Sequence, residues 1–266
     1  MKNRREWIQG GAAYLSAGVG VLGCASSADA SPEPKWVVRP SQERGSADLG
    51  WLQSRHTFSF ARYHDPAHMG FRALRVTNQD RVEAGRGFGM HPHRDMEILS
   101  YVIDGALEHK DSMGSGSIIR PGEVQRMSAG TGVRHSEFNP LSGDATHFLQ
   151  IWLLPDRKGH EPSYEQKAYS VDSRTDQLRL VASQDGREGS VTVHQNVSLY
   201  SAFVKRGRSV SHELRPGRHA WLQLIAGELD LNGRTIAAGD GASVTDAKRL
   251  SIRSTADAHF LLFDLV

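Results

Sequence analysis

Two short runs of the chain carry metal-binding side chains at alternate positions. His91 and His93 flank a proline, and His135 and Glu137 flank a serine. Successive side chains of a β-strand point to opposite faces, so residues two apart project from the same face. If the two runs form neighbouring strands of one barrel, three imidazoles and one carboxylate surround one interior point. The spacing therefore predicts a metal site.

The predicted ligand atoms are nitrogens and oxygens. Imidazole and carboxylate suit Fe, Mn, Ni, Cu and Zn, whereas the single cysteine, Cys24, excludes a thiolate cluster. One His-x-His pair in a chain with 13 histidines is often incidental. Two same-face pairs, joined by a connection rich in glycine, favour metal binding over chance.

The elements that must position these residues are predicted to be strands. Short apolar or alternating runs, separated by Gly, Pro, Asn and Asp, recur from residue 36 onward, without a long helical periodicity. Asn232-Gly233 lies between two such runs and is typical of a two-residue hairpin turn. The pattern predicts an all-β chain of the sandwich or barrel class. The runs include 73–77, 98–103, 147–154, 190–194, 198–204, 220–225, 250–253 and 259–265.

The strand-rich part contains a faint internal duplication. The turn at Gly105 has a counterpart at Gly227, and the turn at Gly122 has one at Gly239. The period is about 120 residues, which favours two similar β-barrels in tandem. A stretch rich in Pro, Gly and charge near 156–162 is the expected boundary. The predicted domains are therefore 36–156, which holds the metal site, and 162–266.

Composition limits the partners. The 266 residues carry a formal net charge of +2, which offers no basic field for nucleic acid. The hydrophobic fraction of 38% suffices for a buried core. One cysteine excludes a disulfide within the chain. We expect a monomer.

Residues 1–30 are predicted to be an N-terminal export signal. A basic start with Arg4 and Arg5 precedes a weakly apolar stretch, and 28–30 (Ala-Asp-Ala) matches a signal peptidase site. The start resembles a twin-arginine signal, although its usual flanking residues are replaced. Residues 21–24, ending at Cys24, also resemble a bacterial lipobox. The expected product is an exported, periplasmic bacterial protein without a transmembrane helix, either free or lipid-anchored through Cys24.

The histidine runs resemble the two motifs of the cupin family, and the wider sequence resembles a pirin. The first cupin-like motif has one extra residue before Gly105, and the second has Gly130 where a proline is expected. The resemblance to pirins spans about residues 37 to 266 and is densest from 50 to 155. A leader is a departure, because pirins are commonly intracellular. The segments that carry the resemblance are 50–52 (GWL), 56–60 (HTFSF), 65–66 (DP), 69–71 (MGF), 87–93 (GFGMHPH), 127–137 (MSAGTGVRHSE) and 150–152 (QIW).

The resemblance implies a bicupin, two tandem jelly-roll β-barrels with one metal ion in the first. It implies His91, His93, His135 and Glu137 as the ligands. The general cupin pattern offers Glu97 instead, which shares strand parity with the first two histidines. The pirin motif favours Glu137, and Glu97 is then expected to orient an imidazole or to form a hydrogen bond within the barrel.

The second barrel is expected to be metal-free. When Gly227 is aligned with Gly105, the positions equivalent to the first-motif histidines and Glu97 hold Glu213, Arg215 and His219. A glutamate, an arginine and a histidine do not make a comparable metal site.

The resemblance to bacterial pirins implies quercetin 2,3-dioxygenase activity, which opens the central ring of a flavonol and releases carbon monoxide. Four ligands leave two adjacent positions of an octahedral ion free, and a divalent ion with one carboxylate keeps a formal positive charge. This favours an anionic chelating substrate, such as a flavonol deprotonated at its 3-hydroxyl, together with dioxygen. Glu137 is the candidate catalytic base. Fe(II) is the favoured ion, with Zn, Mn, Ni, Cu or Co as alternatives.

Two other functions remain open. The chain could be a non-catalytic metal-binding or redox-sensing protein that acts through a protein partner, as nuclear pirins are thought to be. Export from the cytoplasm would argue against a transcription partner. A closed four-ligand zinc site would be structural rather than catalytic.

Overall fold

A computed structural model of the chain describes residues 33–266. The predicted export signal at 1–30, with Cys24 and both candidate cleavage sites, lies outside the described residues. No helix of the described part is long and apolar enough to cross a membrane.

The first half of the described chain is built from short strands with one turn of 3-10 helix. Its strands are mostly joined to sequence neighbours by tight turns, many of which contain a glycine. The elements are β1 (Lys35–Arg39), η1 (Ser41–Glu43), β2 (Gly45–Asp48), β3 (Leu52–His56), β4 (Leu74–Val82), β5 (Gly87–His93), β6 (Glu97–Asp104), β7 (Leu107–Asp111), β8 (Gly116–Ile119), β9 (Glu123–Ser128), β10 (Val133–Phe138), β11 (Thr146–Leu153) and β12 (Ser163–Ala168).

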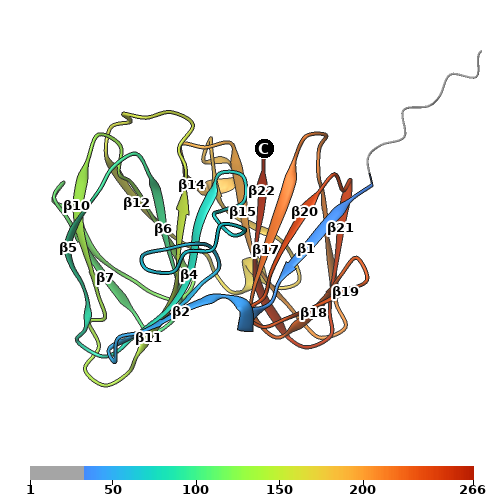
Figure 1. Ribbon diagram of the computed structural model, residues 1–266, viewed down its shortest axis with the longest axis horizontal. Helices are drawn as coiled ribbons and strands as arrows, with labels where there is room; N and C mark the ends of the chain where they lie inside the picture. Colours follow the sequence, from blue (N-terminus) through green and yellow to red (C-terminus); the bar gives the residue numbers. More distant parts are fainter. Residues whose placement is uncertain (1–32) are drawn as a thin grey trace, which may run out of the picture. The chain divides into compact units, whose positions relative to one another are not determined.

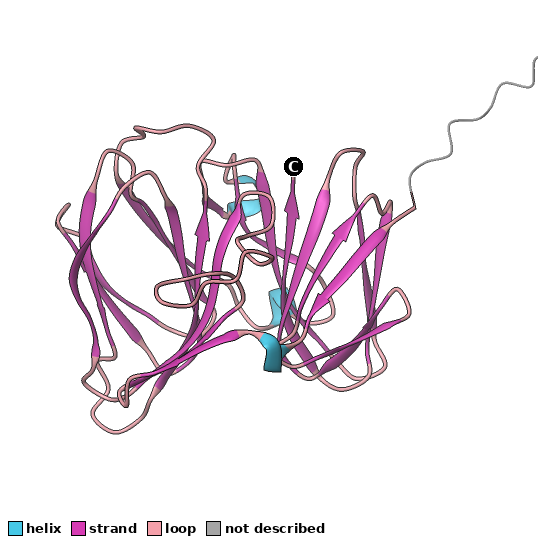
Figure 2. Cartoon of the chain, in the orientation of Figure 1, coloured by secondary structure: helices cyan, strands magenta, loops and turns pink. Residues whose placement is uncertain are grey.

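The second half repeats this pattern, with two further 3-10 turns (Figure 2). The predicted hairpin is present, because β18 and β19 pair on either side of Asn232 and Gly233, both of which have positive φ. The elements are η2 (Asp172–Arg174), β13 (Arg179–Ser183), η3 (Arg187–Gly189), β14 (Val191–Thr192), β15 (Val197–Val204), β16 (Ser209–Glu213), β17 (His219–Ala226), β18 (Glu228–Leu231), β19 (Arg234–Ala237), β20 (Gly241–Thr245), β21 (Arg249–Ser254) and β22 (Ala258–Leu265).

Each half consists of a seven-stranded and a four-stranded sheet (Figure 1). In the first half the sheets have the orders β12-β9-β6-β11-β4-β3-β2 and β5-β10-β7-β8. In the second half the orders are β1-β20-β17-β22-β15-β13-β14 and β16-β21-β18-β19. The two-sheet arrangement confirms the predicted all-β class and the internal duplication.

Two strands cross the linear division of the chain. β1 pairs with β20, in register from Lys35 with Thr245 to Arg39 with Gly241, so it belongs to the second-half sheet. β12 pairs with β9 and belongs to the first-half sheet. A boundary drawn at 156–162 therefore separates each of these strands from the sheet that it completes.

The largest apolar cluster contains residues of both halves. Leu99, Tyr101 and Ile151 of the first-half sheet share this cluster with Trp221 and Phe263 of the second-half sheet. A second cluster fills the interior of the second half with aliphatic side chains such as those of its strands β17 and β22.

The interior of the first half is divided into layers. One apolar cluster includes Leu52, Val102 and Phe148, and another includes Ile98 and Met127. Buried polar side chains belong to neither cluster; they include Ser54, Asp80, Ser100, His109, His135, Glu137 and Gln150. Because buried polar groups are costly unless they are paired, a polar layer in a barrel interior indicates a site.

Candidate metal centre

Strands β5 and β10 place the predicted ligands opposite one another. The strands are antiparallel, and His91 is the direct register partner of His135, while His93 faces Val133. Burial alternates along β10, so His135 and Glu137 are buried and Arg134 is exposed. The predictions that each pair shares one face of its strand and that the two strands pair are confirmed.

Three imidazoles form a compact cluster. One nitrogen each of His91, His93 and His135 lies within 4.8 Å of the others. The Nε2 atoms of His91 and His135 are 3.0 Å apart. Two nitrogens that bind one ion at about 2.1 Å in a right-angled arrangement are about 3.0 Å apart, so the observed separation fits metal ligation.

The hydrogen-bond partners fix which ring nitrogens carry protons. The His91 Nδ1 lies 2.7 Å from the carbonyl oxygen of Gly89, which can only accept, so Nδ1 donates and Nε2 carries a lone pair. In the same way, the Nε2 of His109 donates to the carboxylate of Asp111 at 2.9 Å. The Nδ1 of a neutral His109 is then an acceptor for the Nδ1–H of His135, 3.5 Å away.

It follows that the Nε2 atoms of His91 and His135 face each other with lone pairs. Two lone pairs 3.0 Å apart repel each other unless a metal ion binds both nitrogens or a proton joins them in an N–H···N hydrogen bond. This arrangement is the strongest physical indication of a metal ion in the described residues.

The environment keeps the rings of His93 and His135 neutral, as metal ligation requires. Burial and the neighbouring His135 and His91 lower the pKa of His93 to about 4. Burial, with His91 and His109 close by, lowers the pKa of His135 to about 3. Both imidazoles are therefore unprotonated near neutral pH and available as ligands.

Glu137 lies next to the cluster but is bound to other partners. A β-bulge between His135 and Glu137 shifts the register, so that Glu137 is opposite Phe88. Its Oε1 accepts a hydrogen bond from Ser100 at 2.9 Å, and its Oε2 accepts one from Gln150 at 2.6 Å. A carboxylate oxygen of Glu137 groups with His135 and His109, not with the three-histidine set.

His109 and Asp111 are parts of the site that the sequence reasoning missed. They lie on β7, which pairs with β10, and both side chains are fully buried. Asp111 also accepts hydrogen bonds from the backbone N–H groups of Met113 and Ser115, which hold its carboxylate in place. The signal was present, because His109-x-Asp111 is a third pair with same-face spacing.

Glu97 does not face the metal centre, and its predicted parity with the histidines is wrong. The chain turns at Asp95, which has a φ of 51°, and starts a new strand in the other sheet. The Glu97 carboxylate instead accepts hydrogen bonds from Ser128 and from the backbone N–H of His194, at 2.9 and 3.1 Å. Its other oxygen lies 3.2 Å from the Nδ1 of His194, so Glu97 orients an imidazole of the second half, not a predicted ligand.

Two of the second-half positions aligned with the first site, Glu213 and His219, contact other residues. Glu213 pairs with Arg249 at 3.4 Å. His219 contacts Arg72 of the first half. Glu213 and His219 are therefore each paired with an arginine outside the aligned set.

A cavity of about 410 Å³ opens beside the cluster. His93 reaches into it, and Arg94 and Arg134 contribute two guanidinium groups to its lining. The remaining lining residues are Pro92, Ser112, Gly132 and Val133. His93 is the only predicted ligand in this lining, and Arg134 lies on the outward face of β10, where it donates to the carbonyl oxygen of Met90. The two guanidinium groups give this surface beside the cluster a positive charge.

Known proteins resemble both halves of the chain. The family model for pirin matches residues 37–153, and the model for the quercetinase C-terminal cupin domain matches residues 180–265. Quercetin 2,3-dioxygenase of Escherichia coli (strain K12) is 48% identical over 229 residues, which are 86% of this chain and 97% of that protein. A pirin-like protein of Caulobacter vibrioides is 37% identical over 227 residues, 85% of this chain and 97% of its own length.

Solved structures agree with these matches. The crystal structure of the bacterial pirin YhhW from Escherichia coli in complex with nickel(II) has a TM-score of 0.83 and 45% identity, and covers 87% of this chain and 99% of that chain. The expectation of two cupin domains is confirmed by these matches. The high identity over nearly all of the described residues shows that the chain belongs to the pirin family.

Proposed function

We propose that this pirin is a metal-dependent dioxygenase that opens the central ring of quercetin-type flavonols. The observation that carries the proposal is the cluster of three imidazoles, in which the Nε2 atoms of His91 and His135 face each other at 3.0 Å. The E. coli relative named quercetin 2,3-dioxygenase supports the assignment of an oxidoreductase. The choice of a flavonol as substrate is the more specific part of this proposal.

The proposed ligands are His91, His93, His135 and Glu137. The three imidazoles fit one ion as they stand. Glu137 follows His135 on the same buried face of β10. Each of its carboxylate oxygens accepts one hydrogen bond, so each keeps a second lone pair that can bind the ion. We propose Fe(II) as the native ion. Nickel(II), which the E. coli relative binds in its crystal structure, is the first alternative, ahead of Zn, Mn, Cu and Co.

The protein side chains prepare the site for this chemistry. When bound, the ion supplies Lewis acidity and redox chemistry for the reaction with dioxygen. His109 and Asp111 hold His135 with its Nε2 toward the ion. Ser100 and Gln150 hold the Glu137 carboxylate, which accepts the proton of the flavonol 3-hydroxyl when it is not bound to the ion.

The arginines of the cavity favour an anionic substrate, and the apolar side chains of the interior limit the access of water to the site. Arg94 and Arg134 line the cavity that His93 also lines, and their charge would raise the local concentration of a deprotonated flavonol there. Apolar side chains such as Val133, Met127 and Trp152 form the cluster on one side of the polar layer. A dry site strengthens the attraction between the ion and the deprotonated substrate.

Reconstituted protein tests this proposal. Purified protein loaded with Fe(II) or Ni(II) should consume the flavonol absorbance of quercetin aerobically, together with dioxygen. Glu137→Gln should retain the fold and lose most of the activity, because the amide cannot accept the hydroxyl proton. If the protein turns over no quercetin when loaded with any of the six ions, the dioxygenase proposal is wrong. That result would favour a redox-sensing protein that acts through a partner, or a structural zinc site.

Metal analysis tests the ligand set separately. We expect one ion per chain in the anaerobically purified protein and less than a tenth of that in His91→Ala and His135→Ala. Glu97→Gln is the matched control, because Glu97 lies in the other sheet and should not change the metal content. Full occupancy in His135→Ala would overturn the assignment.

We also propose that the protein acts as a monomer outside the cytoplasm. The matches begin at residue 37 and extend almost to the C-terminus, so this chain carries an N-terminal extension beyond the matched relatives. Cell fractionation with Arg4→Lys plus Arg5→Lys, and with Cys24→Ser, distinguishes the twin-arginine route from lipid anchoring. Cytoplasmic, full-length protein in the unmodified form would contradict the export proposal.

A further inference from the structure

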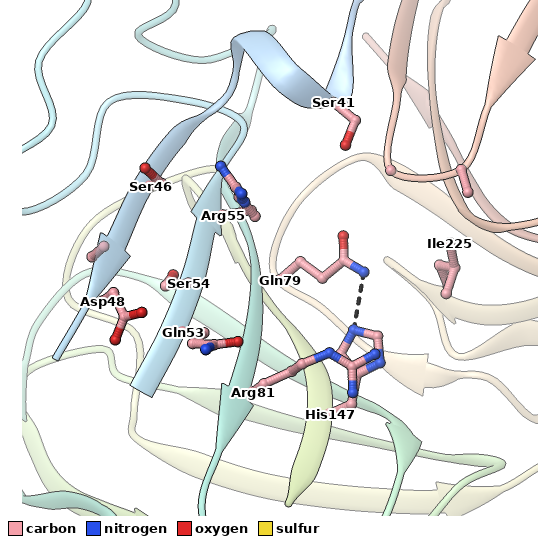
Figure 3. A pocket seen from close by; sticks show the side chains of 13 residues that line it. Ser41, Ser46, Asp48, Gln53, Ser54, Arg55, Gln79, Arg81, His147 and Ile225 are labelled. Atoms are coloured by element: carbon pink, nitrogen blue, oxygen red, sulfur yellow. Dashed lines mark hydrogen bonds between the residues drawn. The ribbon is translucent and has the colours of Figure 1, made fainter. Parts of the chain in front are cut away.

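A second cavity, of about 490 Å³, lies away from the metal centre (Figure 3). Strands β2, β3, β4 and β11 form one wall, and Ile225, Ala238 and Gly239 of the second half complete the lining. Figure 3 shows Gln79, Arg81 and His147 on this wall, with Arg55 on the neighbouring strand. None of the proposed metal ligands lines it.

The strand register brings two arginines to the same face of the sheet. Arg81 pairs with Gln53 and Arg55 pairs with Gln79, so Arg55 and Arg81 are diagonal neighbours on adjacent strands. Diagonal neighbours are about 7–8 Å apart at the backbone, within reach of long side chains. The two guanidinium groups can therefore converge on one ligand.

Neither guanidinium forms an ion pair with a carboxylate of the described residues. Among the described residues, no hydrogen bond or ion pair joins the side chain of Arg55 or Arg81 to another group. The one acidic residue of the lining, Asp48, is two strands away from Arg81 and is a diagonal neighbour of Arg55, but its carboxylate accepts a hydrogen bond from the backbone of Gly50. A second carboxylate, that of Asp104, is the register partner of His147. A third cation, Arg44, is buried behind the wall, partly offset by Asp80 and Asp240.

The wall also holds an imidazole with a fixed tautomer. Arg44 donates to Gln79 Oε1 at 3.0 Å, which orients the amide so that Gln79 Nε2 donates to His147 Nε2 at 2.9 Å. His147 is thus neutral, with its proton on Nδ1. Burial and the adjacent Arg81 lower the pKa of His147 to about 4, in agreement with this state. The ring is a neutral donor in the lining.

We propose that this cavity is a binding site for a small organic anion, whose carboxylate or phosphate group is held by Arg55 and Arg81, with His147 as a further donor. Guanidinium groups match both anions through paired N–H donors. Because the lining comes from both halves, the bound anion contacts both and stabilises their packing. The site is independent of the proposed dioxygenase function.

Calorimetric titration of the metal-loaded protein at constant ionic strength tests the proposal. Inorganic phosphate and malate are the probes, and the one that binds more tightly identifies the class of anion. We expect saturable binding of one anion per chain and a rise in melting temperature. Arg55→Gln and Arg81→Gln should each weaken binding about tenfold, and Arg81→Lys should retain part of it.

Two control variants locate the binding. Arg253→Gln removes an exposed arginine from strand β21 and should leave binding unchanged. Arg134→Gln alters the lining of the cavity beside the metal centre and should also leave binding unchanged. Absence of saturable binding with both probes would overturn the proposal. So would equal weakening in Arg253→Gln, which indicates general charge screening, or weakening in Arg134→Gln alone, which places the anion at the metal centre.

Discussion

At the scale of single residues, His135 is the side chain on which the site depends. Its Nε2 faces His91, and its Nδ1 faces His109, which Asp111 holds in turn. Each bond in this chain requires a particular tautomer, so the orientation of His135 is determined before an ion binds. Preorganised ligands bind an ion more tightly, because less conformational freedom is lost on binding.

Replacing His109 should therefore weaken metal binding without removing a proposed ligand. We expect His109→Phe to lower metal affinity about 10- to 100-fold, because His135 loses the acceptor that fixes its tautomer. Competition with a chelator of known affinity measures this, and Asp111→Asn should show a smaller loss in the same direction. Ser136→Ala, on the outward side of the same strand, is the control. Unchanged affinity in His109→Phe would show that the contact does not position His135.

The arginines that line the cavity beside the cluster should affect the affinity for substrate. Arg94→Gln should raise KM for quercetin roughly threefold to tenfold with little change in kcat, because the charge attracts the anion but does not touch the reacting atoms. Arg86 is exposed, lies close by in sequence and does not line the cavity, so Arg86→Gln is the matched control. An equal effect of both substitutions would indicate long-range attraction alone.

Predictions about single residues were correct where both residues of a pair lie within one strand. The two same-face pairs were correctly predicted, because His91-x-His93 and His135-x-Glu137 each lie within one strand. The parity of Glu97 failed, because the turn at Asp95 separates it from the histidines. His109 was missed, because its contact with His135 depends on which strands are neighbours, and spacing alone does not encode that.

At the scale of elements, the close approach of β5 and β10 keeps the site together. A Cβ atom at Gly87 would lie 2.2 Å from the carbonyl oxygen of Glu137 and 2.5 Å from the Cα of Phe138. Both neighbours are backbone atoms, which cannot rotate away. A side chain there must push the strands apart beside the β-bulge that positions Glu137.

Two glycines of the same strand allow a matched comparison. Gly87→Ala should lower the free energy of unfolding by about 1–3 kcal/mol through overpacking and should reduce metal content. Gly89→Ala should change stability by less than about 0.5 kcal/mol, because no other group lies within 4 Å of the added carbon. Denaturant unfolding with metal analysis measures both. Similar results for the two variants would refute the role assigned to the close approach.

The sequence predicted the strands better than their partners. Turn residues and alternation identify strands locally, and the predicted repeat corresponds to the two similar pairs of sheets. The exchange of β1 and β12 between the halves is a long-range pairing, decided by the free edges of β20 and β9. Nothing in the five residues of β1 distinguishes one sheet edge from the other.

At the scale of the whole molecule, buried histidines link stability to pH. Burial and nearby cations lower the pKa of His259 to about 3, and His147, His93 and His135 are lowered to about 4, 4 and 3. In the unfolded chain these groups titrate near pH 6.5. Between the two values the unfolded chain binds more protons, so acid favours unfolding.

The metal-free protein should therefore lose stability as the pH falls from about 6.5 toward 4. Asp80 opposes this trend, because burial and the nearby Glu137 raise its pKa to about 7, but it offsets only one of the four groups. Denaturant unfolding at several pH values measures the slope, which His259→Gln should reduce. The exposed His64 supplies the control, His64→Gln, which should leave the slope as it is. A stability independent of pH in this window would contradict the burial of neutral imidazoles.

The central claim is that the first half of the molecule would hold a single ion and that the protein uses it to open the flavonol ring. The most direct measurement is the carbon monoxide released when Fe(II)- or Ni(II)-loaded protein consumes quercetin in air. The account predicts one carbon monoxide for each quercetin consumed, and none above background with His135→Ala. Quercetin loss without carbon monoxide, or equal release by His135→Ala, would contradict it.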